Sequence, residues 1–225
     1  AQENTLIGNS AGTALTVGNT NTVVGSFALL SETKGDRNVA IGRSALQSQN
    51  NTSSTDVYNV AVGYAAGVSI TTGVQNIIIG GLAGDALTDA DFNVAIGTGA
   101  LTTDTKGSRT VAIGHSALGT QNHTSATNAD NVAVGFDAGA SITTGQRNVI
   151  VGALAGDALT TGFNNIAIGQ GALGGDVAGG QSIAIGRNAL LAQSFSSSTD
   201  AYNVAVGASA GAAITTGLEN TFIGA

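Results

Sequence analysis

A short glycine-rich segment is the part of the chain that most resembles a ligand-binding motif. Gly169-Gln-Gly-Ala-Leu-Gly174 matches the G-x-G-x-x-G pattern of dinucleotide-binding loops and follows an apolar, strand-like run. Such a site also needs a helix that begins in the loop and an acidic residue about 20 residues later. No helical pattern follows, and the corresponding segment Gly97-Thr-Gly-Ala-Leu-Thr102 lacks the third glycine. We therefore expect neither a nucleotide site nor any other cofactor.

Residues that could bind a metal or catalyse a reaction are few. The chain has no Cys and two histidines, His115 and His123, whereas zinc usually takes four ligands. Asp85 and Asp157 occupy the same position in two repeats, but one carboxylate per repeat does not make a calcium site. No Ser/His/Asp set or carboxylate pair forms a recognisable group. We expect both histidines at the surface, no metal site, and a protein that is not an enzyme.

All these residues lie within a repeat built on the phrase Asn-x-x-[Ile/Val]-Gly. Its glycines are Gly8, Gly25, Gly42, Gly63, Gly80, Gly97, Gly114, Gly135, Gly152, Gly169, Gly186, Gly207 and Gly224. The intervals run 17, 17, 21 and 17 three times, which gives 72-residue units at approximately 8–79, 80–151 and 152–223. Such periodicity marks a solenoid. We predict that residues 1–225 form one all-β array, a parallel β-roll or β-solenoid of about 13 coils.

Positions within a coil are numbered here from the phrase glycine. Position −4 is Asn in all but two coils, where Thr110 and Ser182 replace it, and stacked Asn side chains can form hydrogen-bonded ladders. The predicted ladder comprises Asn38, Asn59, Asn76, Asn93, Asn131, Asn148, Asn165 and Asn203.

Position +3 is always Ala in the complete coils, and position +4 follows the order Gly, Leu, Leu, Gly. A coil of this length has room for two short strands.

The phrase itself reads as a strand that is apolar on both faces. Positions −3 and −1 are mostly Val or Ile and share one face, while position −2 is Ala or a larger apolar residue on the other. A strand of this kind is usually buried on both sides. We expect the second face to pack against other copies of the chain, most simply in a homotrimer.

Every fourth coil carries four additional, mostly polar residues. These insertions lie within Gln47–Val57, Gly119–Ala129 and Leu191–Ala201, and solenoid insertions form loops that often bind partners. A tolerated surface bulge is the alternative. The candidate ligand contacts are Asn50, Asn51, Thr52, Asn122, His123, Thr124, Ser194, Phe195 and Ser196. The expected partner is a host or cell-surface receptor, either protein or glycan.

Charge and composition exclude several classes of partner. The net charge is −7 and the isoelectric point about 4.4, which disfavours nucleic acid and anionic membranes. No apolar run approaches the roughly 18 residues of a membrane span. We expect no nucleic-acid binding and no membrane insertion by this segment.

Several phrases also carry a family resemblance. Asn38-Val-Ala-Ile-Gly42, Asn93-Val-Ala-Ile-Gly97 and Ser182-Ile-Ala-Ile-Gly186, each followed by x-x-Ala, resemble the head repeats of YadA-like trimeric autotransporter adhesins. Asn4-Thr-Leu-Ile-Gly8 and the Thr-Thr-Gly turns resemble repeats of bacteriophage tail fibres and spikes, which the long coils fit better. The resemblance implies a left-handed parallel β-roll with three chains around one axis, in an extracellular fibre on a cell surface or virion.

These observations favour a structural or adhesive fibre module, a stiff trimeric rod that spaces or presents receptor-binding loops within a longer fibre. Two alternatives remain open. Threonine pairs such as Thr71-Thr72 could let a monomeric solenoid bind a periodic ligand such as ice. The chain could also be a filament subunit that stacks end to end, because an uncapped solenoid edge pairs readily with another chain.

Overall fold

The computed structural model describes residues 3–225, which form a parallel β-solenoid of 13 turns spaced about 17 residues apart, with no helix among them. Each turn of the solenoid contributes one three-residue strand taken from the repeated phrase. The predicted fold class and spacing are therefore confirmed.

The main sheet has thirteen strands whose order follows the chain. They are β1 (Thr5–Ile7), β2 (Thr22–Val24), β4 (Val39–Ile41), β6 (Val60–Val62), β7 (Ile77–Ile79), β8 (Val94–Ile96), β10 (Val111–Ile113), β12 (Val132–Val134), β13 (Val149–Val151), β14 (Ile166–Ile168), β16 (Ile183–Ile185), β18 (Val204–Val206) and β19 (Thr221–Ile223). Six two-residue strands lie in the coils next to the insertions: β3 (Gly35–Asp36), β5 (Thr55–Asp56), β9 (Gly107–Ser108), β11 (Thr127–Asn128), β15 (Gly179–Gly180) and β17 (Thr199–Asp200).

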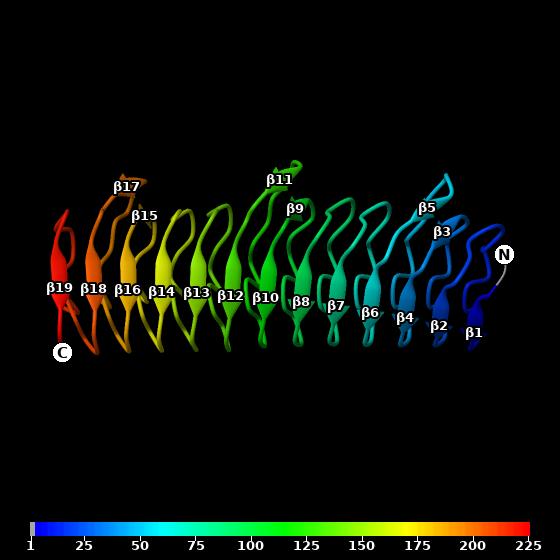
Figure 1. The fold of residues 1–225 in the computed structure, drawn as a ribbon, viewed down its shortest axis with the longest axis horizontal. Coiled ribbons are helices and arrows are strands. Elements are labelled where there is room, and N and C mark those ends of the chain that lie inside the picture. The colour runs from blue at the N-terminus through cyan, green and yellow to red at the C-terminus, as the bar shows by residue number, and fades with distance from the viewer. Residues whose placement is uncertain (1–2) are drawn as a thin grey trace. The chain divides into compact units, whose positions relative to one another are not determined.

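The chain divides into two compact units. One runs to Arg109 and includes His123–Thr127, and the other comprises Thr110–Asn122 and the residues from Asn128 onward. Within each unit the main strands of successive coils lie side by side, parallel and in register, as in the pairs Val39↔Val60 and Val149↔Ile166 (Figure 1). β5 and β17 lie on loops that extend beyond the neighbouring turns (Figure 1).

The two faces of each main strand have different surroundings. In β2 through β18 the central residue, at position −2, points into the core and is fully buried, as at Ala40, Ile78 and Ile150, whereas Leu6 in the terminal strand β1 is exposed. The flanking residues point outward and are half-buried or exposed. One apolar face therefore forms the core of the chain, while the face that carries the larger share of Val and Ile lies on its surface.

Half of the complete coils have no second strand in the segment that follows the main strand. Backbone hydrogen bonds still join successive coils there, such as the Leu29 N–H to the Ala45 carbonyl and the Gly139 N–H to the Ala155 carbonyl. The expectation of two strands per coil is met only beside the insertions, as in the parallel pairs β3–β5 and β15–β17.

One large side chain fills the core of each coil, and it comes from either of two positions. Where position +4 is Leu, as at Leu46 and Leu101, that leucine is fully buried. Where position +4 is Gly, the residue at +7 fills the space instead, as Leu87 and Ile142 do. A Cβ on Gly84 would lie 3.0 Å from a Leu87 methyl carbon, so the two positions cannot both be large.

The phrase glycines stack directly on one another. Their φ angles lie between +120° and +141°, a region that L side chains rarely adopt. A Cβ added to Gly80 would lie 2.6 Å from the Gly97 carbonyl oxygen, and one added to Gly152 would lie 2.7 Å from the Gly169 carbonyl carbon. The backbones of successive coils therefore approach too closely here for any residue but glycine.

We predict that Gly80→Ala lowers the free energy of unfolding by about 3 kcal/mol or more, because it adds backbone strain to a steric clash. The adjacent Gly81→Ala is the matched control, since a Cβ there meets nothing within 4 Å. The control should change stability by about 0.5 kcal/mol or less. Urea denaturation followed by circular dichroism compares the two, and equal midpoints would contradict the close-packing account.

Candidate functional site

Three buried carboxylates lie 72 residues apart beneath the inserted loops. They are Glu32, Asp104 and Asp176, each at position +7 of the coil that follows β2, β8 or β14. All three are fully buried, although half of the complete coils place Leu or Ile at this position. Buried charge is costly unless hydrogen bonds satisfy it. The partners of these carboxylates therefore define what the site does.

Glu32 is surrounded by donors from its own turn and from the inserted loop. Its Oε1 accepts the N–H groups of Thr33, Lys34 and Gly35 at 2.9, 3.0 and 2.8 Å, and that of Asn51 at 3.0 Å. Its Oε2 accepts the side-chain amides of Gln49 at 2.8 Å and Asn51 at 2.9 Å. Three of these six hydrogen bonds, those from Gln49 and Asn51, tie the first inserted loop to the carboxylate.

The other two carboxylates repeat the same core of contacts. Asp176 Oδ1 accepts the N–H groups of Gly179 and Phe195, both at 3.1 Å, and its Oδ2 accepts the Gln193 side-chain amide at 2.7 Å. Asp104 Oδ1 accepts the N–H groups of Gly107 at 3.0 Å and His123 at 2.9 Å. Each carboxylate therefore accepts hydrogen bonds both from the backbone of its own turn and from the backbone N–H of a residue at the start of the inserted loop.

Glutamines at position +7 of the next coil connect these carboxylates to the asparagine ladder. Gln193 donates to Asp176 and, at 3.0 Å, to the Ser182 hydroxyl, and it accepts the Asn203 amide at 2.8 Å. Gln49 likewise accepts the Asn59 amide at 2.8 Å. The buried acidic residue, the glutamine of the next coil and the asparagine ladder therefore form one continuous buried hydrogen-bond network in these coils.

The ladder itself follows the predicted column. Typically the Oδ1 of one Asn accepts the backbone N–H of the next, as between Asn59 and Asn76 at 2.8 Å, while the amide donates to a turn carbonyl, as from Asn76 to Ala90 at 2.8 Å. The members Asn59, Asn76, Asn93, Asn131, Asn148 and Asn165 are all buried and all take part in such bonds.

The two breaks in the Asn column have a physical reason. At the −4 position that precedes an insertion, the next Asn of the column follows after 21 residues and not 17. The side-chain amide of that next Asn donates to a glutamine, as Asn59 does to Gln49. Asn38 stands at such a −4 position, and its buried Oδ1 has no hydrogen-bond partner. Thr110 and Ser182 stand at the equivalent positions, and their hydroxyls accept the amides of Gln121 and Gln193 at 3.2 and 3.0 Å.

The structure divides the predicted loop contacts into two groups. Asn50, Thr52, Thr124, Ser194 and Ser196 are exposed, and Asn122 is half-buried. Asn51, His123 and Phe195, which stand at one equivalent position, are instead 6%, 5% and 7% exposed. Their side chains point into the coil because their backbone N–H groups bind the buried carboxylates. The interpretation of these three as surface ligand contacts is therefore wrong.

The two histidines have different environments. His115 is exposed and stacks on Phe136 with 5.3 Å between ring centroids, as expected of a surface residue. The expectation that His123 is also at the surface is wrong. Its Nδ1 lies 3.5 Å from Asp104 Oδ2 without hydrogen-bond geometry, and neither of its ring nitrogens has a hydrogen-bond partner.

The chemistry of this site is that of an anchor. The carboxylates are closed off from solvent and surrounded by donors, so no substrate can reach them. Among residues 3–225 no group of three or more His, Cys, Asp or Glu is placed to hold a metal ion. The glycine-rich segment after β14 continues as a turn and not as a helix. The sequence contains a signal for these carboxylates at position +7, where successive coils have Leu, an acidic residue, Gln and Ile in the same order in all three units.

Burial alone would raise the pKa of the Glu32 carboxyl, but hydrogen bonds from Gln49, Asn51, Gly35 and Lys34 together hold that pKa below its ordinary value. A lowered folded-state pKa means that Glu32 stabilises the protein above the ordinary pKa, near 4.5, and loses this contribution as pH falls through the lowered value. We predict that Glu32→Gln is less stable than the parent by about 2 kcal/mol at pH 7. The difference should shrink below about pH 4. Thermal unfolding between pH 3 and 7 tests this, and a constant difference would contradict it.

Replacing Asn38 by serine, the residue found at the equivalent position 182, should remove an unsatisfied acceptor and give Gln49 a hydroxyl partner. We predict that Asn38→Ser raises the free energy of unfolding by up to about 1 kcal/mol, after the loss of its amide bond to Asn21. Asn76→Ser is the control, because Asn76 is bonded on both sides, and it should lower stability by about 1–2 kcal/mol. Equal losses in both variants, measured by urea denaturation, would refute this explanation of the column breaks.

Comparison of the chain with protein-family models, with curated proteins and with solved structures finds no match in any of the three. Among the described residues there is also no helix with the length and apolarity needed to cross a bilayer. What the chain does must therefore be inferred from its own repeat, its anchored loops and its surfaces.

Proposed function

We propose that the chain is a structural and adhesive fibre module. In this proposal three copies form a stiff β-roll rod, part of an extracellular fibre such as a cell-surface adhesin or a phage tail fibre. The rod spaces or presents loops that contact a receptor, and it catalyses no reaction. The resemblance of its repeats to adhesin heads and phage fibres motivates the extracellular setting.

The observation that carries the proposal is the outer sheet face, formed by the residues at positions −3 and −1 of the main strands. In β4 through β8 and in β10 through β18 every one of these residues is Val or Ile. Ile41, Ile77, Ile79, Ile168 and Val206 are between 36% and 41% exposed. A large contiguous apolar surface normally marks an interface.

Another copy of the chain is the partner that fits this face best. The outer sheet face is a row of stacked β-branched side chains, such as Val60 beside Ile77 and Val132 beside Val149, repeated from coil to coil. A partner that covers many coils must present the same spacing, which a second copy does. Three copies around an axis would bury the face of each chain, and burial contributes roughly 25 cal/mol for each Å² of apolar surface.

The anchored loops suit the presenting role. Each inserted loop is fixed at its base by a buried carboxylate, whereas Thr52, Ser53 and Ser54 at the tip of the first loop are exposed, as are Thr124 and Ser196 in the others. Loops held on a rigid scaffold are common sites of recognition. The exposed members of the predicted set remain the proposed receptor contacts.

The ice-binding alternative receives less support. The first hydroxyl of the threonine pairs donates to the backbone of the next coil, as from Thr71 to the Thr88 carbonyl and from Thr143 to the Thr160 carbonyl, both at 3.2 Å. Those hydroxyls are engaged within the solenoid and are not free to order water. Neither this alternative nor end-to-end stacking is favoured by a specific observation.

Light scattering during size exclusion tests the proposal. The full chain should have a mass of about 65 kDa, three times the 21.8 kDa of one chain. Ile77→Lys/Ile79→Lys should shift the mass toward one chain, because it places charges on the outer sheet face. Ser53→Lys/Ser54→Lys adds the same charge to an exposed loop and should leave the mass unchanged.

A milder pair, Ile77→Thr/Ile79→Thr, guards against simple unfolding, since threonine already occupies position −3 in β1, β2 and β19. Circular dichroism confirms that each variant is folded. A parent chain that is monomeric, with all variants equally monomeric, would exclude the trimeric fibre.

A further inference from the structure

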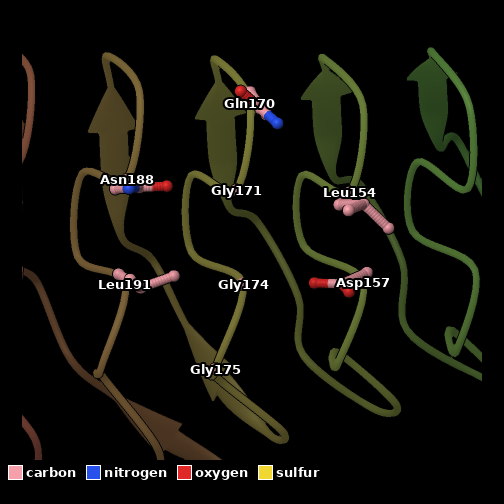
Figure 2. A pocket seen from close by; sticks show the side chains of 8 residues that line it. All are labelled: Leu154, Asp157, Gln170, Gly171, Gly174, Gly175, Asn188 and Leu191. Atoms are coloured by element: carbon pink, nitrogen blue, oxygen red, sulfur yellow. The ribbon is translucent and has the colours of Figure 1, made fainter.

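The third 72-residue unit has a hollow on its surface. The hollow measures about 360 Å³ and lies across three successive coils, those that follow β13, β14 and β16. Its lining residues are Leu154, Asp157, Gln170, Gly171, Gly174, Gly175, Asn188 and Leu191 (Figure 2). All of them belong to the second compact unit.

Two glycines of the middle coil line the hollow. Gly174 and Gly175 stand where the preceding unit has Thr102 and Thr103 and the first has Leu30 and Ser31. A Cβ on Gly174 would lie 3.2 Å from Asp157 Oδ1 and 3.5 Å from a Leu191 methyl carbon. A Cβ on Gly175 would lie 2.5 Å from the Leu191 carbonyl oxygen, so this glycine is required by close backbone packing. At Gly174 the third unit lacks the side chain that Thr102 directs toward Asp85 in the preceding unit.

Polar and apolar groups converge on the open space. Figure 2 shows the Asp157 carboxylate and the Leu191 side chain reaching from the two flanking coils toward Gly174, and the Asn188 amide reaching toward Gly171. Leu154 and Leu191 are each 40% exposed and form the apolar walls. Burial raises the pKa of the Asp157 carboxyl, its own backbone N–H opposes this, and nearby Asp137 raises it further.

The sister coil indicates which chemical group belongs beside this carboxylate. Asp85 is the equivalent of Asp157, and its Oδ1 accepts the Thr102 hydroxyl at 2.5 Å. Gly174 removes that hydroxyl from the third unit. The carboxylate thus lacks the donor that its counterpart has, in a place that also has two side-chain amides and aliphatic walls.

We propose that this hollow binds a hydroxyl-rich ring, a single sugar residue, whose hydroxyl replaces that of the missing threonine at Asp157. Further hydroxyls bond to the amides of Asn188 and Gln170, and the C–H face of the ring packs on Leu154 and Leu191. Small-molecule sites span about 300–1,000 Å³, so this volume takes one ring and not an extended ligand. The absence of a following helix separates the site from a phosphate-binding loop. The inference does not depend on how many chains assemble.

Saturation-transfer difference NMR on the full chain tests the site, with the methyl glycosides of glucose, galactose, mannose and N-acetylglucosamine as probes. At least one glycoside should give a signal with a millimolar Kd, the range expected for so small a ligand. Gly174→Thr restores the sister residue and should abolish the signal. Ser197→Ala, in the exposed loop of the same unit, should retain it.

Asp157→Ala provides a second test should Gly174→Thr fail to fold, and it should also abolish the signal. Propylamine distinguishes a hydroxyl ligand from a cation that the carboxylate would attract. Binding of propylamine without any glycoside would overturn the proposed ligand class. A glycoside signal that persists in Gly174→Thr, or none with the parent chain, would overturn the site.

Discussion

The stacking of glycine on glycine is the constraint on which the rest of the solenoid depends. At the phrase position the backbones of adjacent coils lie so close that a Cβ on Gly80 would strike the Gly97 carbonyl. This contact fixes the register of the strands, as in the pairing of Ile78 with Ala95. Because the register cannot drift, four additional residues cannot be absorbed along the coil. They must leave it as a loop, and the base of that loop brings polar backbone groups into the interior.

The buried acids are the consequence of that intrusion. Backbone N–H groups at the loop base need acceptors, and an unpaired one costs about as much as a lost hydrogen bond. Glu32 and Asp176 supply those acceptors at a position that is Leu or Ile in half of the coils, and leucine at +4 fills the core of their coils instead. The residues at +4 and +7 therefore vary together: a coil with Gly at +4 has Leu or Ile at +7, and a coil with Leu at +4 has an acid or Gln at +7.

The repeat predicted the fold closely because every coil reports the same geometry, and the strands and the Asn ladder fall where the phrase placed them. It did not reveal which strand face is internal, since both are apolar and only the turns decide that Ala40 points inward. It also misplaced Asn51, His123 and Phe195, because a polar loop was interpreted as wholly external. Their inward orientation follows from hydrogen bonds between their backbone N–H groups and the buried carboxylates at position +7, which were not among the predicted site residues.

Some residues differ from the consensus of the repeat, and in some of these cases a neighbouring side chain supplies the hydrogen bond that would otherwise be lost. Thr110 and Ser182 break the Asn column, but Gln121 and Gln193 bond to their hydroxyls, so packing explains the change. The equivalent residue of the first unit is still asparagine, and the side-chain oxygen of this Asn38 is buried without a hydrogen-bond partner. Replacement by Thr or Ser avoids such an unpaired oxygen. Gly174 differs from both cases, because among the residues that line its hollow none takes the place of the lost threonine hydroxyl at Asp157. The third unit thus combines an open space with a carboxylate that lacks the threonine donor of its counterpart Asp85, and this combination is the basis of the proposed sugar site.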